Sequence, residues 1–297
     1  MAPRLETIVQ HIGSLPTLPS VLLRVNDLVN NPKSSALQLS RVIMEDQALT
    51  VRLLRLVNSP FYGFPRRIAT VTEALTILGF NQVRNLLLTV TVVDLLGAEE
   101  TADFSPMRLW QHSVGTAVAG SLIAKRIGHE DREELFVAGL LHDVGKLVEF
   151  QVARKFFLQA LQVVKVRDLL LRDAEQEVFG YSHDQVGRLL GEQWKLPVRL
   201  GEAIACHHRP DLAQAAKREA AIIHLADILS RALGLGSGGD DAVPPLSLEA
   251  WQRLRLPEAS LAGLMKELEE QYEDAQGLLL QRAPTQPGST EQLSHVS

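Results

Sequence analysis

The chain has 297 residues, of which 46% are hydrophobic, 22% charged and only 5% aromatic, as in a globular protein with a sizeable core. A formal net charge of −5 argues against a general nucleic-acid binder, because such proteins present a basic face. The sequence shows no secretory signal and no run of about 18 apolar residues, so we expect a cytoplasmic protein without membrane contact. Its one cysteine, Cys206, has no partner for an internal disulfide.

Leucine and alanine are abundant and long β-branched runs are scarce, so the sequence predicts an all-α fold. In the first part, Ser35 with Gln38 and Thr70 with Glu73 form capping boxes, and Gly79 is expected to end a helix. Apolar residues at helical spacing predict helices near 22–29, 35–43, 49–57, 70–78 and 83–95. The aromatic residues Phe61, Tyr62 and Phe64, in the turn that follows Asn58, are expected to seal a join between subdomains.

A polar break then precedes a second group of helices, predicted near 109–127, 133–147, 182–194, 197–207 and 217–233. The glycine-rich stretch 234–245 resembles a flexible linker, and two amphipathic segments follow it. The last of these segments is compatible with covering the core or with forming a homodimer. The predicted organisation is an N-terminal helical subdomain over residues 1–100, packed on a helical bundle over residues 101–282, and a disordered tail over residues 283–297.

The stretch "GLLHDVGKL", residues 139–147, places His142 and Asp143 among apolar neighbours. One interpretation is a helix C-terminus, with Gly145 as a left-handed stop and Lys146 facing the negative end of the helix dipole. The other is a metal site, because a buried imidazole beside a carboxylate needs a partner. Both side chains reach one cavity only near a helix end, which Gly145 is expected to supply.

Other residues of metal-binding type also lie among apolar neighbours, namely His112, His183, His207, His208 and Asp227. Imidazoles and carboxylates without thiolates suit one or two ions of iron, manganese, zinc or nickel, and a carboxylate can bridge two of them. Each histidine taken singly is also compatible with a hydrogen-bonded core residue. We expect His11 and His129 at the surface and His224 behind the ligands, while Cys206 is either a ligand or a small apolar residue.

From about Leu15 to Leu233 the sequence resembles HDOD domains, helical bacterial signalling modules related to HD-domain phosphohydrolases. The motifs "SLPTLPS", "LWQHS", "LLHDVGK", "YSHDQVGRLLGEQWKLP" and "CHHRP" follow one another in the family's order. The resemblance implies an all-α fold with an N-terminal helical subdomain packed on an HD-like subdomain. It also implies regulation, because HDOD domains commonly lack the full HD ligand set and act as scaffolds or relays.

This sequence departs from that pattern by keeping the ligands. By resemblance to HD proteins, one ion would be held by His112, His142, Asp143 and Asp227. By resemblance to HD-GYP phosphodiesterases, a second would be held by His183, His207 and His208 with Asp143 bridging, and Lys146 would contact substrate phosphate. Two features count against cyclic-di-GMP cleavage and a third ion: "RPDLAQ" replaces the Gly-Tyr-Pro loop, and Arg108 stands where three-metal enzymes place a glutamate.

Three functions remain open, and we favour the first. In the first, the chain is a signalling module whose metal site is structural or sensory, and it acts through contacts with signalling proteins or by sensing a nucleotide. Alternatively it is a metal-dependent phosphohydrolase on a nucleotide or cyclic dinucleotide, with water activated near neutral pH and Lys146 steadying the phosphate. In the third the histidines belong to the core, and the protein is a metal-free scaffold.

Overall fold

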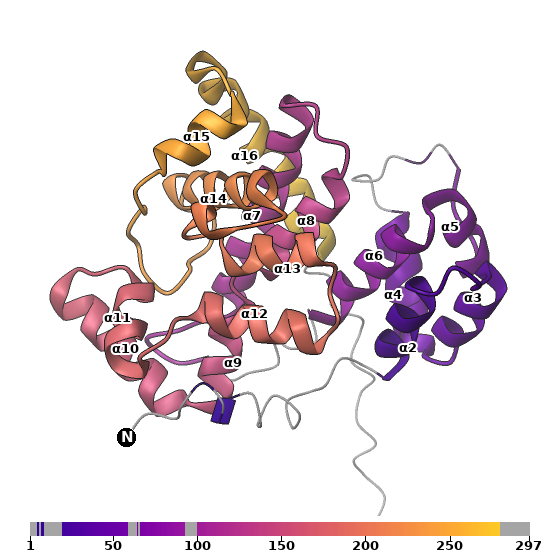
Figure 1. Cartoon of the computed structure of the whole chain (residues 1–297), viewed down its shortest axis with the longest axis horizontal. Coiled ribbons are helices and arrows are strands. Elements are labelled where there is room, and N and C mark those ends of the chain that lie inside the picture. Colours follow the sequence, from indigo (N-terminus) through magenta and orange to yellow (C-terminus); the bar gives the residue numbers. More distant parts are fainter. Residues whose placement is uncertain are drawn as a thin grey trace, which may run out of the picture.

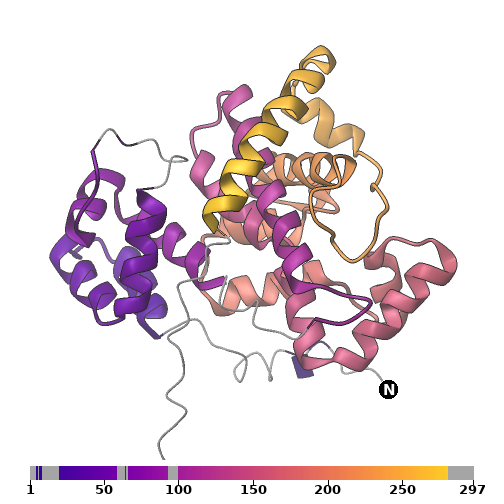
Figure 2. The same cartoon turned by 180° about the vertical axis from the view of Figure 1, so that it is seen from behind.

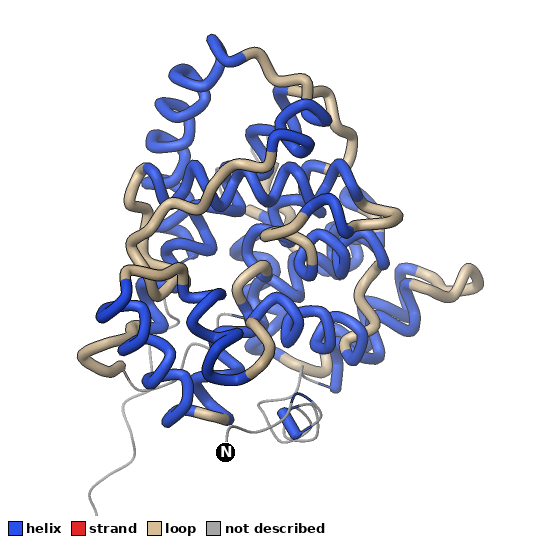
Figure 3. The backbone as a smooth tube through the Cα atoms, turned by 60° about the vertical axis from the view of Figure 1, so that its left-hand side comes forward, coloured by secondary structure: helices blue, strands red, loops and turns tan. Residues whose placement is uncertain are grey.

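The computed structural model describes residues 5, 7, 8, 20–58, 64, 66–92 and 100–279, and within them all regular structure is helical (Figure 3). The predicted all-α class is confirmed. The aromatic residues Phe61 and Tyr62, His11 and the predicted tail over 283–297 lie outside this described part. No described helix is both long and apolar enough to span a membrane.

The helices that precede residue 93 form an N-terminal lobe, seen at the right of Figure 1. They are α2 (Ser20–Val29), α3 (Ala36–Met44), α4 (Gln47–Val57), α5 (Val71–Leu78) and α6 (Phe80–Val92). The capping box of Ser35 and Gln38 is present, and the Thr70 side chain accepts from the backbone N–H of Glu73. Gly79 ends α5 with a φ of 81°, as predicted.

The remaining helices form a larger C-terminal lobe around α7, which packs against α8, α14 and α16. In chain order they are α7 (Pro106–Arg126), α8 (Arg132–Leu141), α9 (Val144–Val152), α10 (Arg154–Arg167), α11 (Leu171–Phe179), α12 (His183–Gln193), α13 (Val198–Ala205), η2 (Pro210–Leu212), α14 (Lys217–Ala232), α15 (Leu248–Leu254), η3 (Glu258–Ser260) and α16 (Leu261–Leu279). Seen from behind in Figure 2, α16 crosses this lobe along α7. Its Leu264 and Leu268 are fully buried, so this helix covers the core; the homodimer stays a prediction.

The two lobes meet where α2 contacts the end of α12 and where α6 packs on α8. The Asn26 side-chain amide donates to the carbonyl oxygens of Trp194 (3.1 Å) and Lys195 (2.8 Å). Lys195 in turn pairs with Asp27 at 2.7 Å. The predicted boundary between residues 100 and 101 stays a prediction, because residues 93–99 lie outside the described part.

Four expectations were wrong. The helix predicted over 133–147 is two helices, α8 and α9, separated at His142 and Asp143. Gly145 is not the stop, since it lies inside α9 and is not among the residues with positive φ. Its role is steric: a Cβ there would overlap the carbonyl oxygen of His183, so glycine is what lets α9 and α12 touch.

The other two errors concern segments around this contact. Helices α10 and α11 lie in a stretch for which the sequence predicted none. The predicted linker is packed structure: the backbone N–H of Ser237 donates to the carbonyl oxygen of Arg108 at 2.9 Å, and Asp240 is buried. Residues 236–239 therefore form a strap across the C-terminal lobe.

Candidate metal centre

The seven predicted ligands converge although they come from five places in the chain. His112 lies in the first third of α7, His142 and Asp143 occupy the α8–α9 break, and His183 is the first residue of α12. The others are in the turn that follows α13 and on α14, namely His207, His208 and Asp227. Six of the seven are buried and His208 is half-buried. The potential ligand atoms form two groups, and within each group all atoms lie within 4.8 Å of one another. The first group is His112, His142 and Asp143; the second is Asp143, His183, His207 and His208.

Asp143 belongs to both groups because its two carboxylate oxygens face opposite ways. Oδ2 lies 3.3 Å from Nε2 of His142 and 3.6 Å from Nε2 of His112. Oδ1 lies 3.2 Å from Nε2 of His183 and 3.8 Å from Nε2 of His207. This is the arrangement expected of a carboxylate that bridges two ions.

Asp227 completes the first group from α14. Its Oδ1 lies 3.0 Å from Nε2 of His112 and 3.8 Å from Nε2 of His142. Arg231, one turn further along α14, donates from Nε to the same oxygen at 2.9 Å and from Nη1 to Asp240 at 2.6 Å. The carboxylate is thus held toward His112 by a buried guanidinium.

The second group brings two imidazole nitrogens unusually close. Nε2 of His183 lies 2.9 Å from Nε2 of His208, and the rings of His207 and His208 have centroids 3.9 Å apart. Three of the seven ligands turn their Nδ1 away from the centre: His142 donates to Gly139 O (2.7 Å), His207 to Ile204 O (2.6 Å) and His183 to Glu175 (2.6 Å). Their Nε2 atoms therefore face inward, which is how metal-binding histidines are oriented.

A cation fits this donor set, because several inward-facing atoms make no hydrogen bond of good geometry, although some of them lie 3.0–3.8 Å from another candidate ligand. They are Nε2 of His112, His142 and His207, Oδ1 of Asp143 and Oδ2 of Asp227. Leaving a buried polar atom unpaired costs about 1–3 kcal/mol, so five in one small space call for a common partner. Nitrogen and oxygen donors without thiolate suit a divalent transition metal.

The electrostatics of the site favour the protonation states that ligation needs. Burial lowers the pKa of His112, His207 and His208, which keeps these rings neutral. Burial alone would raise the pKa values of the two aspartates, but His142 and Lys146 at Asp143, and Arg231 at Asp227, lower both well below the ordinary value. Both carboxylates are therefore ionised at neutral pH.

His183 differs from the other histidines in its carboxylate partner. Although burial alone lowers its pKa, the adjacent Glu175 carboxylate raises the pKa of His183 to about 9. His183 would have to give up this proton to hold an ion through Nε2.

Lys146 is placed differently from the expectation of a substrate contact. It is fully buried, and its Nζ lies 2.7 Å from Oδ2 of Asp143. A Cβ on Gly238 would lie 3.2 Å from Nζ and 2.9 Å from Nη2 of Arg231, so the strap covers both cations. The fully buried Nζ of Lys146 is not accessible to a phosphate in this structure.

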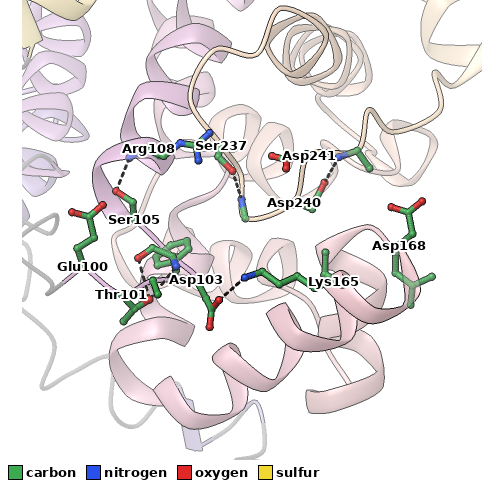
Figure 4. A pocket seen from close by; sticks show the side chains of 16 residues that line it. Glu100, Thr101, Asp103, Ser105, Arg108, Lys165, Asp168, Ser237, Asp240 and Asp241 are labelled. Carbon is green, nitrogen blue, oxygen red and sulfur yellow. Dashed lines mark hydrogen bonds and ion pairs between the residues drawn. The ribbon is translucent and has the colours of Figure 1, made fainter.

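On the outer side of the strap lies a cavity of about 650 Å³, drawn in Figure 4. Ser237 and Asp240 line it from the strap side, Arg108 from α7, and Lys165, which pairs with Asp103, from α10. None of the seven candidate ligands lines this cavity.

Several residues that support the centre escaped the sequence analysis. Arg231 follows Asp227 by four residues on one helix, a spacing that was available as a signal. Glu175 gave no signal, because a glutamate on a polar helix resembles a surface residue, whereas the apolar neighbours of Glu149 on α9 were available as a signal. His224, expected behind the ligands, donates from Nδ1 to the carbonyl oxygen of His207 at 2.8 Å.

Two other expectations concern residues outside the centre. His129 was expected at the surface, but its side chain is only 9% exposed and its Nε2 lies 3.6 Å from Glu219. Cys206 belongs to neither ligand group, and burial raises the pKa of its thiol to about 11.

A helical fold around a buried His/Asp cluster that could hold metal defines the class of this protein. The chain matches the HDOD domain family over residues 15–210 and belongs to that family. A protein of Treponema pallidum (strain Nichols) with no characterised role is 26% identical over 203 residues, which are 68% of this chain and 39% of that relative. The match thus spans about two fifths of the relative's length.

Solved structures repeat the fold. An HDOD domain protein of unknown function from Geobacter sulfurreducens is 29% identical, with a TM-score of 0.73 over 93% of this chain and 98% of its own. A candidate signal transduction protein from Marinobacter aquaeolei VT8 is 23% identical, with a TM-score of 0.71. The match covers 95% of this chain and 62% of the Marinobacter chain. A candidate phosphohydrolase from Shewanella amazonensis SB2B is 23% identical, with a TM-score of 0.68 over 92% of this chain and 96% of its own. At these last two identities the likeness shows the fold alone.

Proposed function

We propose that this HDOD module is a regulatory protein that holds two divalent transition-metal ions in its His/Asp centre and acts through contacts with signalling proteins. The observation that carries the proposal is Asp143, whose two oxygens face the two ligand groups separately. Two such groups sharing one carboxylate are what a paired metal site requires.

The first ion would take His112, His142, Asp143 and Asp227, and the second would take His183, His207 and His208 with Asp143. Iron, manganese, zinc and nickel all suit this donor set. Bound ions supply positive charge that links side chains from different helices. Two of those helices, α8 and α12, also meet the N-terminal lobe, so ion occupancy would act on the joint that Asn26 forms with α12.

Enclosure favours regulation over turnover. Six of the ligands and Lys146 are buried, and the strap lies over Lys146 and Arg231. A catalytic metal site keeps an open position for substrate. The cavity of about 650 Å³ beside the strap is lined by none of the candidate ligands.

A phosphohydrolase is the second candidate, and the pairing of a bridging carboxylate with a lysine favours it. Paired ions supply Lewis acidity and charge neutralisation for phosphate-ester hydrolysis. In that case Lys146 would release Asp143 to bind the phosphate of a nucleotide or cyclic dinucleotide, after the strap has moved. A candidate phosphohydrolase among the structural relatives shares the fold at 23% identity.

The test of metal binding is metal content by mass spectrometry on anaerobically purified protein, comparing wild type with Asp143→Asn. We expect close to two ions per chain in the wild type and a loss of both in the variant, because the amide keeps the shape but removes the bridging charge. Asp173→Asn, on the exposed side of α11, is the matched control and keeps both ions. Folded wild type that stays empty after iron, manganese and zinc are offered would leave the metal-free scaffold.

Turnover separates the two metal-dependent functions. The regulatory proposal predicts no metal-dependent hydrolysis of a phosphodiester chromogen or of nucleotides by the loaded protein. Hydrolysis that disappears in both Asp143→Asn and Lys146→Met would establish the phosphohydrolase instead.

A further inference from the structure

Glu175 on α11 is a fully buried carboxylate directed at one residue of the candidate centre. Its Oε2 accepts two hydrogen bonds from His183, one from the backbone N–H at 3.0 Å and one from Nδ1 at 2.6 Å. A single carboxylate oxygen thus fixes both the start of α12 and the ring orientation of its first residue. Ser182, which caps α12, contributes no such contact to the ring.

The consequence lies on the other side of the ring. With Nδ1–H committed to Glu175, Nε2 of His183 faces Oδ1 of Asp143 at 3.2 Å and Nε2 of His208 at 2.9 Å. A carboxylate behind an imidazole selects the tautomer and raises the basicity of the ligating nitrogen. Neither His207 nor His142 has this support, because their Nδ1 groups donate to neutral backbone carbonyls.

The position of α11 is itself fixed from the first ligand group. The backbone N–H of Leu171, at the start of α11, donates to Asp240 at 3.0 Å. Asp240 also accepts from Arg231, which donates to Asp227. Glu175 is therefore held in place by a chain of buried hydrogen bonds.

We infer that Glu175 is the positioning residue of the second ion site: it acts through His183, and it sets the affinity of that site without touching the ion. The inference rests on the proposed metal centre. It assigns a role to a residue that neither ligand group contains.

The experiment measures zinc binding by competition with a chromophoric chelator in wild type, Glu175→Gln and Glu175→Leu. Gln keeps an acceptor for His183 but loses the charge, so we expect about 10-fold weaker binding of the second ion; Leu loses both, and we expect about 100-fold. The first ion changes by less than about 3-fold. Glu177→Gln is the matched control, because Glu177 lies on the exposed side of the same helix and pairs with Arg167.

A spectroscopic measurement distinguishes positioning from general damage to the fold. In zinc-loaded protein labelled with ¹⁵N-histidine, the hydrogen-bonded Nδ1–H signal of His183 should persist in Glu175→Gln and be lost in Glu175→Leu. The Gln variant alone suffices if the Leu variant does not fold. Two ions bound with wild-type affinity and an unchanged His183 signal in both variants would overturn the role of Glu175 alone. A wild type that binds no zinc would overturn the metal centre and this inference together.

Discussion

The two halves of the candidate centre are supported by different kinds of structure. In the first half, His112 and Asp227 lie inside α7 and α14, and His142 is the C-cap of α8; these three helices pack on one another. A Cβ on Gly139 would lie 2.5 Å from Cα of Ala117, so α7 and α8 are in backbone contact. The second half, His183, His207 and His208, is carried by the first residue of α12 and by a turn.

This difference indicates that the two halves hold their ligands with different rigidity. Ligands in the interior of packed helices are rigid, because moving them requires the core to repack. A ligand in a turn, such as the half-buried His208, moves at lower cost, since fewer buried contacts hold it. We therefore expect the first half to keep its ion as part of the structure and the second half to exchange its ion more readily.

The largest expected effect comes from the contact that joins the halves. Val at Gly145 would overlap the carbonyl oxygen of His183 and force α9 and α12 apart. We expect Gly145→Val to lower the free energy of unfolding by about 3 kcal/mol or more, measured by urea denaturation, and to abolish binding of both ions. Gly201→Ala, a helical glycine with no atom within 4 Å of its added Cβ, should be neutral or slightly stabilising. Two retained ions in Gly145→Val would show that the halves do not depend on this contact.

The sequence predicted most of the helices, the capping box at Ser35 and the cap at Thr70, and it singled out the seven residues that the structure brings together. These features are local: a cap needs residues three apart, and a histidine among leucines is visible in a single helix. Gly145 shows where local patterns stop being informative. Glycine is used both as a left-handed helix stop and as a site of close backbone approach, and the neighbouring residues do not distinguish the two.

The support of the second half was missed for a related reason. Glu175 lies on a helix with a polar sequence, and only contact with His183, eight residues away, reveals that it is buried. The sequence predicted a flexible linker at the strap because glycine-rich segments are typical of linkers. In the structure the glycines of the strap allow close packing, since a Cβ on Gly239 would lie 2.7 Å from Leu171. Long-range contacts of this kind are not encoded in spacing.

Single-ligand variants sharpen the comparison between the halves. His112→Ala should remove one ion and lower the free energy of unfolding of the metal-free protein by about 2–3 kcal/mol, because it leaves a buried cavity beside α7. His208→Ala should also remove one ion but change that free energy by less than about 1 kcal/mol, because His208 is half-buried. Metal analysis and urea denaturation on chelator-treated protein report the two quantities, with His129→Ala as a control that keeps both ions. Equal destabilisation by the two ligand variants would contradict the proposed difference in rigidity.

The smallest expected effect concerns Glu149, the carboxylate that lies behind the second half. It is fully buried on α9 beside Glu175, and neither of its oxygens has a hydrogen-bond partner. Burial first, and then the charge of Glu175, raises the pKa of Glu149 well above its ordinary value. The folded chain therefore keeps a proton that the unfolded chain releases near pH 4.

The sign of the pH dependence follows from this proton. Stability that depends on protonated Glu149 is fully present below about pH 4 and is lost as the pH rises toward the folded-state pKa. Gln has no proton to release, so Glu149→Gln should gain about 1–2 kcal/mol over wild type between pH 5 and pH 8 in chelator-treated protein. Glu177→Gln should show no such gain. If Glu149→Gln followed the wild-type pH profile, the buried carboxylate would have a partner, and the second half would be as well supported as the first.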